Sequence, residues 1–187
     1  MKNPAADTDW QRFEQSVQLF QKYGDRYGFD YLMVTAQGFQ ESRLDQNAKS
    51  RAGAVGIMQL MPTTGKALGV GDIHQAEPNV HGGIKYMRNL LDNYFKDAHF
   101  DDTNRTLFAF AAYNAGPGRI AGLRREAAKQ GLDPDIWFNN VELVAARRIG
   151  QESVSYVRNI YKYYMAYKLQ LETLQARRHA LDGASPK

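Results

Sequence analysis

The residue in this sequence best placed to do chemistry is a single carboxylate, Glu41. It lies near the end of a predicted helix, on a ridge with apolar neighbours, and a glycine-dotted loop follows it directly. Apolar surroundings disfavour the charged form of a carboxylate and raise its pKa, which suits a general acid near neutral pH. Most glutamates on helices are solvated surface residues, so the pattern makes Glu41 a candidate only. Enzymes that cleave glycosidic bonds usually use two carboxylates, so a partner is also expected.

Two amide side chains stand beside glycine-containing turns, where they can point into a cleft. Gln59 follows Gly56 closely, and Asn114 closely precedes Gly116. Asparagine is also a common turn former, so turn structure alone is an alternative explanation for it. Eleven tyrosines is a high number for 187 residues. Tyrosine rings can line a sugar groove, although amphipathic packing better explains the cluster at 161–167.

Composition and spacing exclude several kinds of site. The absence of cysteine excludes disulfides, thiolate metal sites and cysteine nucleophiles. The four histidines lack the spacing of a metal site, and no phosphate-binding loop, dinucleotide fingerprint or serine nucleophile motif occurs. We therefore predict neither a metal nor a cofactor.

The net charge of +4 could favour an anionic polymer such as nucleic acid, an acidic lipid surface or a cell wall. The simpler explanation is a solvated surface with a slight surplus of lysine and arginine. No basic run is long enough to indicate a nucleic-acid site. No apolar run approaches the roughly 20 residues of a membrane span, and the N-terminus has no apolar signal core. The chain could therefore be cytosolic, or it could be an excised domain of a longer exported protein.

Helical periodicity of apolar residues dominates the chain, and no segment shows the clear alternation of a strand. The length suits one domain with a hydrophobic core. We predict a mainly α fold with a mobile N-terminal segment at 1–8, one domain at 9–174 and a mobile C-terminal tail at 175–187. Helices are expected at about 9–27, 31–44, 59–68, 78–95, 106–113, 119–130, 136–149 and 151–174.

Four short motifs occur in a fixed order along the chain. They are Gln40-Glu41-Ser42 with Ser50 after it, then Gly56-Ile57-Met58-Gln59-Leu60-Met61, then Ala112-Tyr113-Asn114-Ala115-Gly116, and last Gln151-Glu152-Ser153-Val154-Ser155-Tyr156-Val157. In this order and spacing they resemble the motifs of the soluble lytic transglycosylase (SLT) domain family. The resemblance covers roughly residues 23–167. Any one motif would be weak evidence for this family, whereas four motifs in the same order and spacing are specific evidence for it.

The resemblance implies a mainly α, lysozyme-like fold with at most a small irregular β element. It also implies an enzyme that cleaves the β-1,4 bond between N-acetylmuramic acid and N-acetylglucosamine in peptidoglycan. Water is not the nucleophile in that reaction, and the product carries a 1,6-anhydromuramyl end. Carried over by position, Glu41 is the acid and base, and Glu152 gives secondary electrostatic support across the cleft. The substrate-binding residues implied in this way are Ser50, Gln59, Met61, Tyr113, Asn114 and Tyr156.

One acid can suffice for such a reaction. The 2-acetamido oxygen of the substrate can stabilise positive charge at C1, and the C6 hydroxyl of the same sugar can close the ring. Among the possible partners, Asp45 is only four residues from Glu41 and is interpreted as a helix-end residue. No spacing argument places Glu142 at the cleft. Glu152 is therefore the favoured secondary group.

Residues 137–142 and the helix with Tyr161, Tyr163 and Tyr164 look most similar to the membrane-bound lytic transglycosylase F subfamily. In that subfamily this domain follows a periplasmic solute-binding-like domain. The similarity implies peptidoglycan glycan strands as the partner, no nucleic acid, a possible upstream regulatory domain in the full-length protein and a monomer. It also implies the periplasm or cell envelope, with outer-membrane association in the full-length protein. Two alternatives stay open: a hydrolytic muramidase or chitinase on the same fold, and an inactive wall-binding assembly module.

Overall fold

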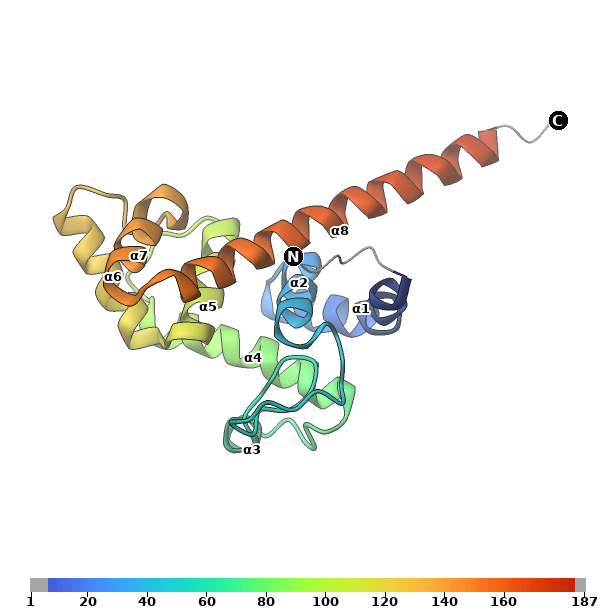
Figure 1. Ribbon diagram of the computed structural model, residues 1–187, viewed down its shortest axis with the longest axis horizontal. Helices are drawn as coiled ribbons and strands as arrows, with labels where there is room; N and C mark the ends of the chain where they lie inside the picture. The colour runs from blue at the N-terminus through green and yellow to red at the C-terminus, as the bar shows by residue number, and fades with distance from the viewer. Residues whose placement is uncertain (1–6, 184–187) are drawn as a thin grey trace.

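The computed structural model describes residues 7–183, and the side chains of residues 7–178. In this part of the chain, eight α-helices and one short π-helical turn follow one another (Figure 1). Their bounds are α1 Asp7–Tyr27, α2 Tyr31–Ser42, α3 Pro62–Leu68, α4 Ala76–Tyr94, α5 Asp102–Ala115, α6 Pro117–Lys129, η1 Trp137–Val141, α7 Glu142–Ile149 and α8 Gln151–Gly183.

The β content of the fold is confined to the loop between α2 and α3. Between residues 7 and 183 no strand forms, and two isolated backbone bridges pair Lys49 with Val55 and Val55 with Leu60. The prediction of a mainly α fold with at most a small irregular β element is therefore confirmed. None of the described helices combines the length and the apolar character needed to cross a membrane.

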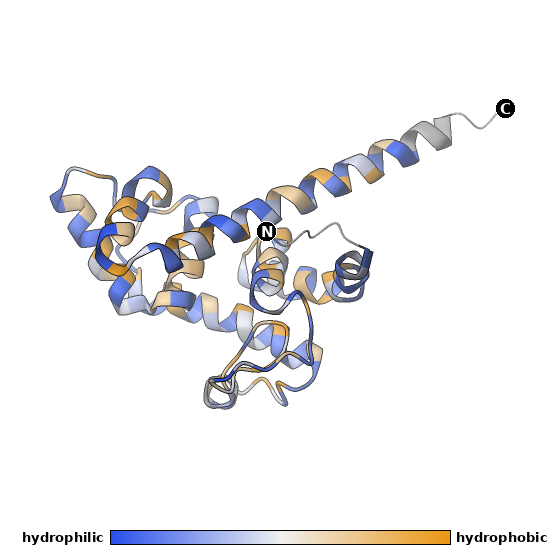
Figure 2. Ribbon diagram, viewed as in Figure 1, coloured by the Kyte–Doolittle hydropathy of each residue, from blue (hydrophilic) through white to orange (hydrophobic). Residues whose placement is uncertain are grey.

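The core forms around α2, which is buried along most of its length. Every residue from Leu32 to Phe39 is buried, and α1 and α8 pack against this helix. At Gly38 a Cβ atom would lie 2.7 Å from a ring carbon of Phe20 in α1 and 3.1 Å from Ile57 in the following loop. The missing side chain therefore lets α1 and the loop lie directly on α2. In Figure 2 hydrophobic and hydrophilic residues alternate along the helices, as helices with one buried face require.

α2 ends at Ser42, two residues before the predicted end at Leu44. Arg43 and Leu44 both adopt left-handed backbone conformations, with φ of 58° and 60°. The Arg43 guanidinium pairs with the buried carboxylate of Asp9 in α1, and the N–H of Arg43 donates to carbonyls of the last turn of α2. These contacts stabilise a conformation that non-glycine residues seldom adopt, and they turn the chain sharply away just after Glu41.

The segment predicted as one helix from 136 to 149 consists of two elements. Asn139 is left-handed, with φ of 59°, so the chain kinks within η1 before α7 begins. The N–H of Asn139 donates to the Glu142 carboxylate at 3.2 Å, and the N–H of Trp137 donates to Asn104 of α5 at 2.9 Å. These bonds favour the kink, and the periodicity of apolar residues carries no sign of them.

Two helices extend well beyond their predicted bounds. α5 begins at Asp102 because the Asp101 side chain accepts the N–H of Asn104 at 2.6 Å, which caps the helix four residues before the predicted start. α8 continues past Leu174 to Gly183 and projects from the body of the domain (Figure 1). Most of the predicted tail is therefore helical. Of the predicted mobile ends at 1–8 and 175–187, residues 1–6 and 184–187 lie outside the described residues, and Asp7 and Thr8 belong to α1.

Candidate active site

The last turn of α2 presents Glu41 to a tyrosine of α8. Glu41 is partly exposed, and its Oε1 atom accepts a hydrogen bond from the hydroxyl of Tyr156, 115 residues later in the chain. Tyr156 lies in the second turn of α8 and is only 7% exposed. The packing of α8 on α2 therefore brings together two residues that are far apart in the sequence.

Gln37, one turn before Glu41 in α2, supports this contact. Gln37 is fully buried, and its Nε2 donates to the Tyr156 hydroxyl at 3.2 Å. A hydroxyl has one hydrogen, so a tyrosine oxygen that accepts from Gln37 directs its own hydrogen to Glu41. Gln37 was assigned no role from the sequence. The available signal was a polar residue one turn before the candidate acid in a mostly apolar helix.

The two tyrosines that interact with Glu41 stay protonated at neutral pH. Burial raises the pKa of Tyr156 well above its ordinary value of 10, and the charge of Glu41 raises it further. Burial and then the charge of Glu41 likewise raise the pKa of Tyr113. Neither hydroxyl can therefore act as a base, and both serve as neutral hydrogen-bond donors. Glu41 is left as the group of this cluster that can gain and lose a proton.

The loop before α3 takes its shape from a buried asparagine of α4. Asn79 is fully buried; its Oδ1 accepts the N–H of Met58 at 2.8 Å, and its Nδ2 donates to the carbonyls of Val55 at 2.8 Å and Ile73 at 2.9 Å. At Gly56, where φ is +78°, a Cβ atom would lie 2.4 Å from the Asn79 amide nitrogen. Glycine is therefore required there for both conformation and space. Sequence reasoning missed Asn79, although a polar side chain beside the apolar stripe of this helix was a signal.

Two hydroxyls tie this loop to the helices around it. Tyr113, at the end of α5, donates to the carbonyl of Met58 at 2.7 Å. Ser42, next to Glu41, donates to the carbonyl of Ile57 at 2.9 Å. The ends of α2 and α5, the loop and the first turns of α8 therefore form one connected group around Glu41, and all four sequence motifs meet in it.

Comparison with known protein families identifies the family to which the chain belongs. A model described as the transglycosylase SLT domain matches residues 18–136, which are 119 of the 187 residues. The chain belongs to the transglycosylase SLT domain family.

Individual relatives support the same assignment. The chain is similar to membrane-bound lytic murein transglycosylase F of Desulfosudis oleivorans, with 34% identity over 159 residues, 78% of this chain and 35% of the relative. It is also similar to the protein of that name from Vibrio cholerae, with 32% identity over 179 residues, 88% of this chain and 33% of the relative. The chain thus spans about a third of the length of these relatives. The matches confirm the predicted resemblance to transglycosylase F.

The fold has solved counterparts. The structure resembles that of the 70 kDa soluble lytic transglycosylase of Escherichia coli, with a TM-score of 0.63 and 24% identity over 82% of this chain and 24% of that chain. It resembles lytic transglycosylase Slt of Pseudomonas aeruginosa equally well, with a TM-score of 0.63 and 23% identity over 83% of this chain and 24% of that chain. These likenesses confirm the predicted SLT fold.

Two predicted substrate-binding residues of the SLT domain shape the loop itself. Gln59 is half-buried, with a left-handed φ of 47°, and its Nε2 donates to the carbonyls of Gly56 at 2.9 Å and Ala48 at 3.3 Å. Ser50 is exposed, and its hydroxyl accepts the N–H of Ala54 at 3.0 Å. Both side chains hold the backbone of the loop in place. Contact with a sugar remains a prediction for each of them.

Two further predicted substrate-binding residues lie at the borders of the group. Met61 immediately precedes α3 and is 39% exposed, which is unusual for a long apolar side chain. Asn114 is exposed in the last turn of α5, next to Tyr113. Both side chains are therefore accessible to a ligand from solvent.

Glu152 lies in the first turn of α8 and is exposed. It precedes Tyr156 by four residues, so the two side chains project from one face of the helix about 5–6 Å apart at their Cβ atoms. Because the Tyr156 hydroxyl contacts Glu41, this spacing puts Glu152 one helical turn away from the contact. Its secondary electrostatic role remains a prediction that this placement supports.

The other carboxylates that could have partnered Glu41 have structural roles. Glu142 is 2% exposed and forms an ion pair with Arg158 of α8. Asp45 lies past the left-handed turn that ends α2 and forms an ion pair with Arg12 of α1 at 3.5 Å. Among the described residues, no group of three or more histidine and acidic side chains could hold a metal ion.

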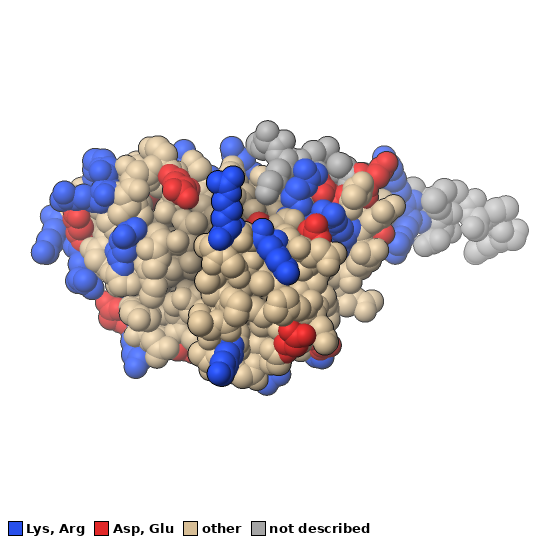
Figure 3. Space-filling view, turned by 60° about the horizontal axis from the view of Figure 1, so that its bottom comes forward, with Lys and Arg blue, Asp and Glu red and all other residues tan. Residues whose placement is uncertain are grey.

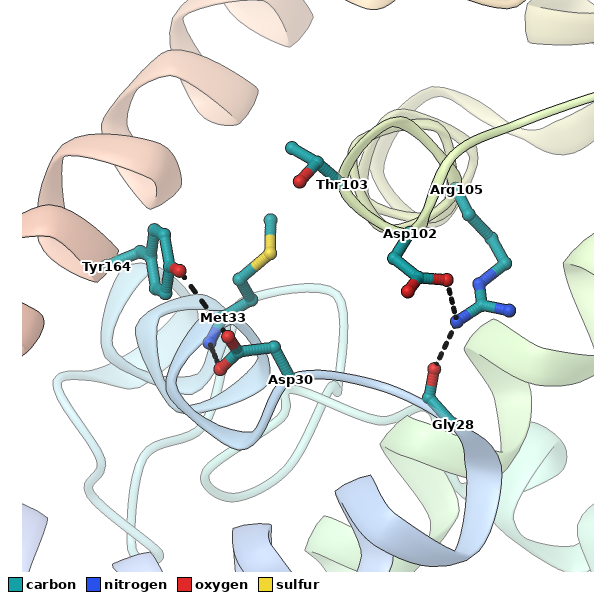
Figure 4. Close-up of a pocket in the computed structure, with 7 residues that line it drawn as sticks. All are labelled: Gly28, Asp30, Met33, Asp102, Thr103, Arg105 and Tyr164. Atoms are coloured by element: carbon teal, nitrogen blue, oxygen red, sulfur yellow. Dashed lines mark hydrogen bonds and ion pairs between the residues drawn. The ribbon is translucent and has the colours of Figure 1, made fainter.

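A polar hollow of about 220 Å³ lies at the opposite end of α2 from Glu41 (Figure 4). Its charged groups are already paired. Arg105 donates to the carbonyl of Gly28 at 2.6 Å and pairs with Asp102 at 3.2 Å, and the Tyr164 hydroxyl donates to Asp30 at 3.4 Å. Asp30 is about 16 Å from Glu41 along the helix axis, at 1.5 Å per residue. This hollow is a junction between helices, remote from the cluster around Glu41.

Proposed function

We propose that this SLT domain is a peptidoglycan lytic transglycosylase. It cleaves the β-1,4 bond between N-acetylmuramic acid and N-acetylglucosamine and leaves a 1,6-anhydromuramyl end. The observation that carries the proposal is the contact of Glu41 with the Tyr156 hydroxyl, which places one partly exposed carboxyl among neutral donors. The names of the curated relatives, membrane-bound lytic murein transglycosylase F, support the substrate and the reaction.

Glu41 acts first as an acid and then as a base. Its protonated carboxyl gives a proton to the glycosidic oxygen, and the bond from C1 to that oxygen breaks. The acetamido oxygen of the muramyl sugar stabilises the charge at C1. The Glu41 carboxylate then takes the proton of the C6 hydroxyl, and O6 bonds to C1. The carboxyl ends protonated, ready for another cycle, and no second carboxylate is needed to activate water.

Tyr156 and Gln37 position this carboxyl. A hydroxyl donor stabilises the carboxylate that remains after proton donation, because hydrogen bonds to charged acceptors are stronger than neutral ones. The bond also fixes one oxygen of Glu41 and so orients the other toward the substrate. Tyr156 is almost fully buried, and we propose that it acts on the reaction through its hydrogen bond to Glu41.

Further residues complete the proposed site. Glu152, one turn from Tyr156 in α8, adds negative charge that stabilises the developing positive charge at C1. The remaining sugar contacts are assigned to Ser50, Gln59, Met61, Tyr113 and Asn114. All five belong to the loop before α3 or to the end of α5, next to Glu41.

The surroundings of the enzyme follow from its substrate. Peptidoglycan lies in the cell envelope, and the relatives are named membrane-bound. We propose a periplasmic location, with outer-membrane association and an upstream solute-binding-like domain in the full-length protein. We propose that the domain itself acts as a monomer.

The mass of the products tests the proposal against the alternatives. Digestion of purified peptidoglycan should release muropeptides with anhydromuramyl ends. Reducing ends, heavier by one water, would instead show a hydrolytic muramidase or chitinase. An absence of soluble products would favour the wall-binding assembly module.

A further inference from the structure

A hollow between α3 and α4 has the lining of a carbohydrate site. Its volume is about 530 Å³, within the range of small-ligand pockets. None of the residues that line it is charged, although Lys, Arg, Asp and Glu make up 24% of the chain. Thr63 and Thr64 of α3 face Tyr86, Asn89 and Asn93 of α4 across it. In Figure 3 the side of α3 is turned toward the viewer, and uncharged residues make up most of that surface.

The α4 side of the hollow forms an accessible wall. Tyr86 and Tyr94 bound it, and eight residues at 1.5 Å each put them about 12 Å apart along the helix. Tyr94 is 49% exposed, and both asparagines between them are exposed. The Nδ2 of Asn93 donates to the backbone carbonyl of Asn89 at 2.8 Å. Rings and amide groups are therefore exposed along a stretch longer than one pyranose ring.

This hollow continues the proposed active site. The loop that carries Met61 leads directly into α3. The turn after Asn114 leads to Pro117, which also lines the hollow. The ring of Tyr86 packs edge-on against Tyr113, with 5.4 Å between ring centroids. A strand of sugars bound at Glu41 therefore has a direct route into the space between α3 and α4.

We propose that the hollow between α3 and α4 is a distal subsite for an N-acetylated sugar of the glycan strand, beyond the two sugars of the scissile bond. Tyr86 and Tyr94 pack against the ring faces, and Asn89 and Asn93 bond to hydroxyl and acetamido groups. The peptide stems of peptidoglycan carry carboxylates, for which an uncharged lining offers no partner. This inference rests on the proposed function. It makes long glycan strands better ligands and substrates than short ones.

Binding of soluble N-acetylglucosamine oligomers to the Glu41→Gln protein tests the subsite without cleavage. The hexasaccharide spans the distal site, whereas the disaccharide does not reach it. Tyr94→Ala should weaken hexasaccharide binding roughly threefold to tenfold and leave disaccharide binding unchanged. Asn93→Ala, at an exposed position, should act in the same direction. Asp92→Asn is the matched control on α4, since Asp92 pairs with Arg88 outside the hollow.

Two results would overturn the subsite: unchanged hexasaccharide binding in both variants, or equal weakening for the two oligomers. The test separates this inference from the proposed function. If the length-dependent loss occurs and the unsubstituted protein fails to cleave peptidoglycan, the subsite stands and the proposed function fails. If the unsubstituted protein cleaves peptidoglycan and Tyr94→Ala leaves hexasaccharide binding unchanged, only the subsite proposal fails.

Discussion

Replacing Tyr156 by phenylalanine removes one oxygen from the centre of the proposed site. The ring keeps its packing, while Glu41 loses a donor and the buried Nε2 of Gln37 loses its acceptor. A hydrogen bond to a charged group contributes about 1.5–3 kcal/mol. Because the bond strengthens when Glu41 becomes a carboxylate, the loss falls on the transition state and should lower kcat roughly tenfold to a hundredfold. The unpaired Gln37 amide should lower the free energy of unfolding by about 1–3 kcal/mol.

The assay for Tyr156→Phe is the initial rate of anhydromuropeptide release, measured beside urea unfolding. Tyr164→Phe is the matched control, because it removes a hydroxyl from the same helix that bonds to a carboxylate, Asp30, at the far end of α2. The control should retain full activity. If Tyr156→Phe turns over at the normal rate, or if both variants lose activity equally, the positioning role of Tyr156 is wrong.

Three further predictions test separate parts of the account. Glu152→Gln should fold normally and lose less activity than Glu41→Gln; a larger loss in the same release assay would mean that the two roles are inverted. Gly56→Ala should lower the free energy of unfolding in urea by about 3 kcal/mol or more, because it adds backbone strain and displaces Asn79. Gly53→Ala, at φ of +91° with open space around its Cβ, should cost only about 1–2 kcal/mol, and equal costs would contradict the clash. The free energy of unfolding should also fall as pH rises above about 10, because Tyr113, Tyr156 and Tyr167 have raised pKa values in the folded state and ionise first in the unfolded chain. Urea titrations from pH 8 to 11 measure this loss, and Tyr167→Phe should reduce it; a pH-independent stability would show that burial of these hydroxyls is not coupled to folding.

The sequence predicts much of the fold because most of its helices carry a clear apolar periodicity. The helix expected at 78–95 was predicted from a stripe of Val80, Ile84, Met87, Leu91 and Tyr94. In α4 the first four of these residues are buried, whereas Tyr94 is 49% exposed. The glycines of this helix also matter: a Cβ on Gly83 would lie 2.7 Å from Met58. The end of α2 and the kink at Asn139 could not be predicted in this way, because contacts between residues far apart in the sequence stabilise them: Arg43 with Asp9 at the end of α2, and Trp137 with Asn104 beside the kink.

The candidate site was only partly predictable for a related reason. Motif spacing identified Glu41, Tyr113 and Tyr156, yet nothing in it shows that the Tyr156 hydroxyl meets Glu41, since that contact depends on how α8 packs on α2. Gln37 and Asn79 were missed because single buried polar residues in helices lack a spacing pattern of their own. Their partners are backbone groups and hydroxyls that come into reach only in the folded chain.

The central claim is that Glu41 alone carries out both proton transfers. The most direct measurement compares Glu41→Gln with the unsubstituted protein on purified peptidoglycan, with products identified by mass and folding checked by thermal unfolding. Loss of general acid catalysis predicts a fall of about a hundredfold to ten-thousandfold in the release of anhydromuropeptides, with an unchanged melting temperature. A correctly folded Glu41→Gln protein that releases anhydromuropeptides at the normal rate would contradict the account.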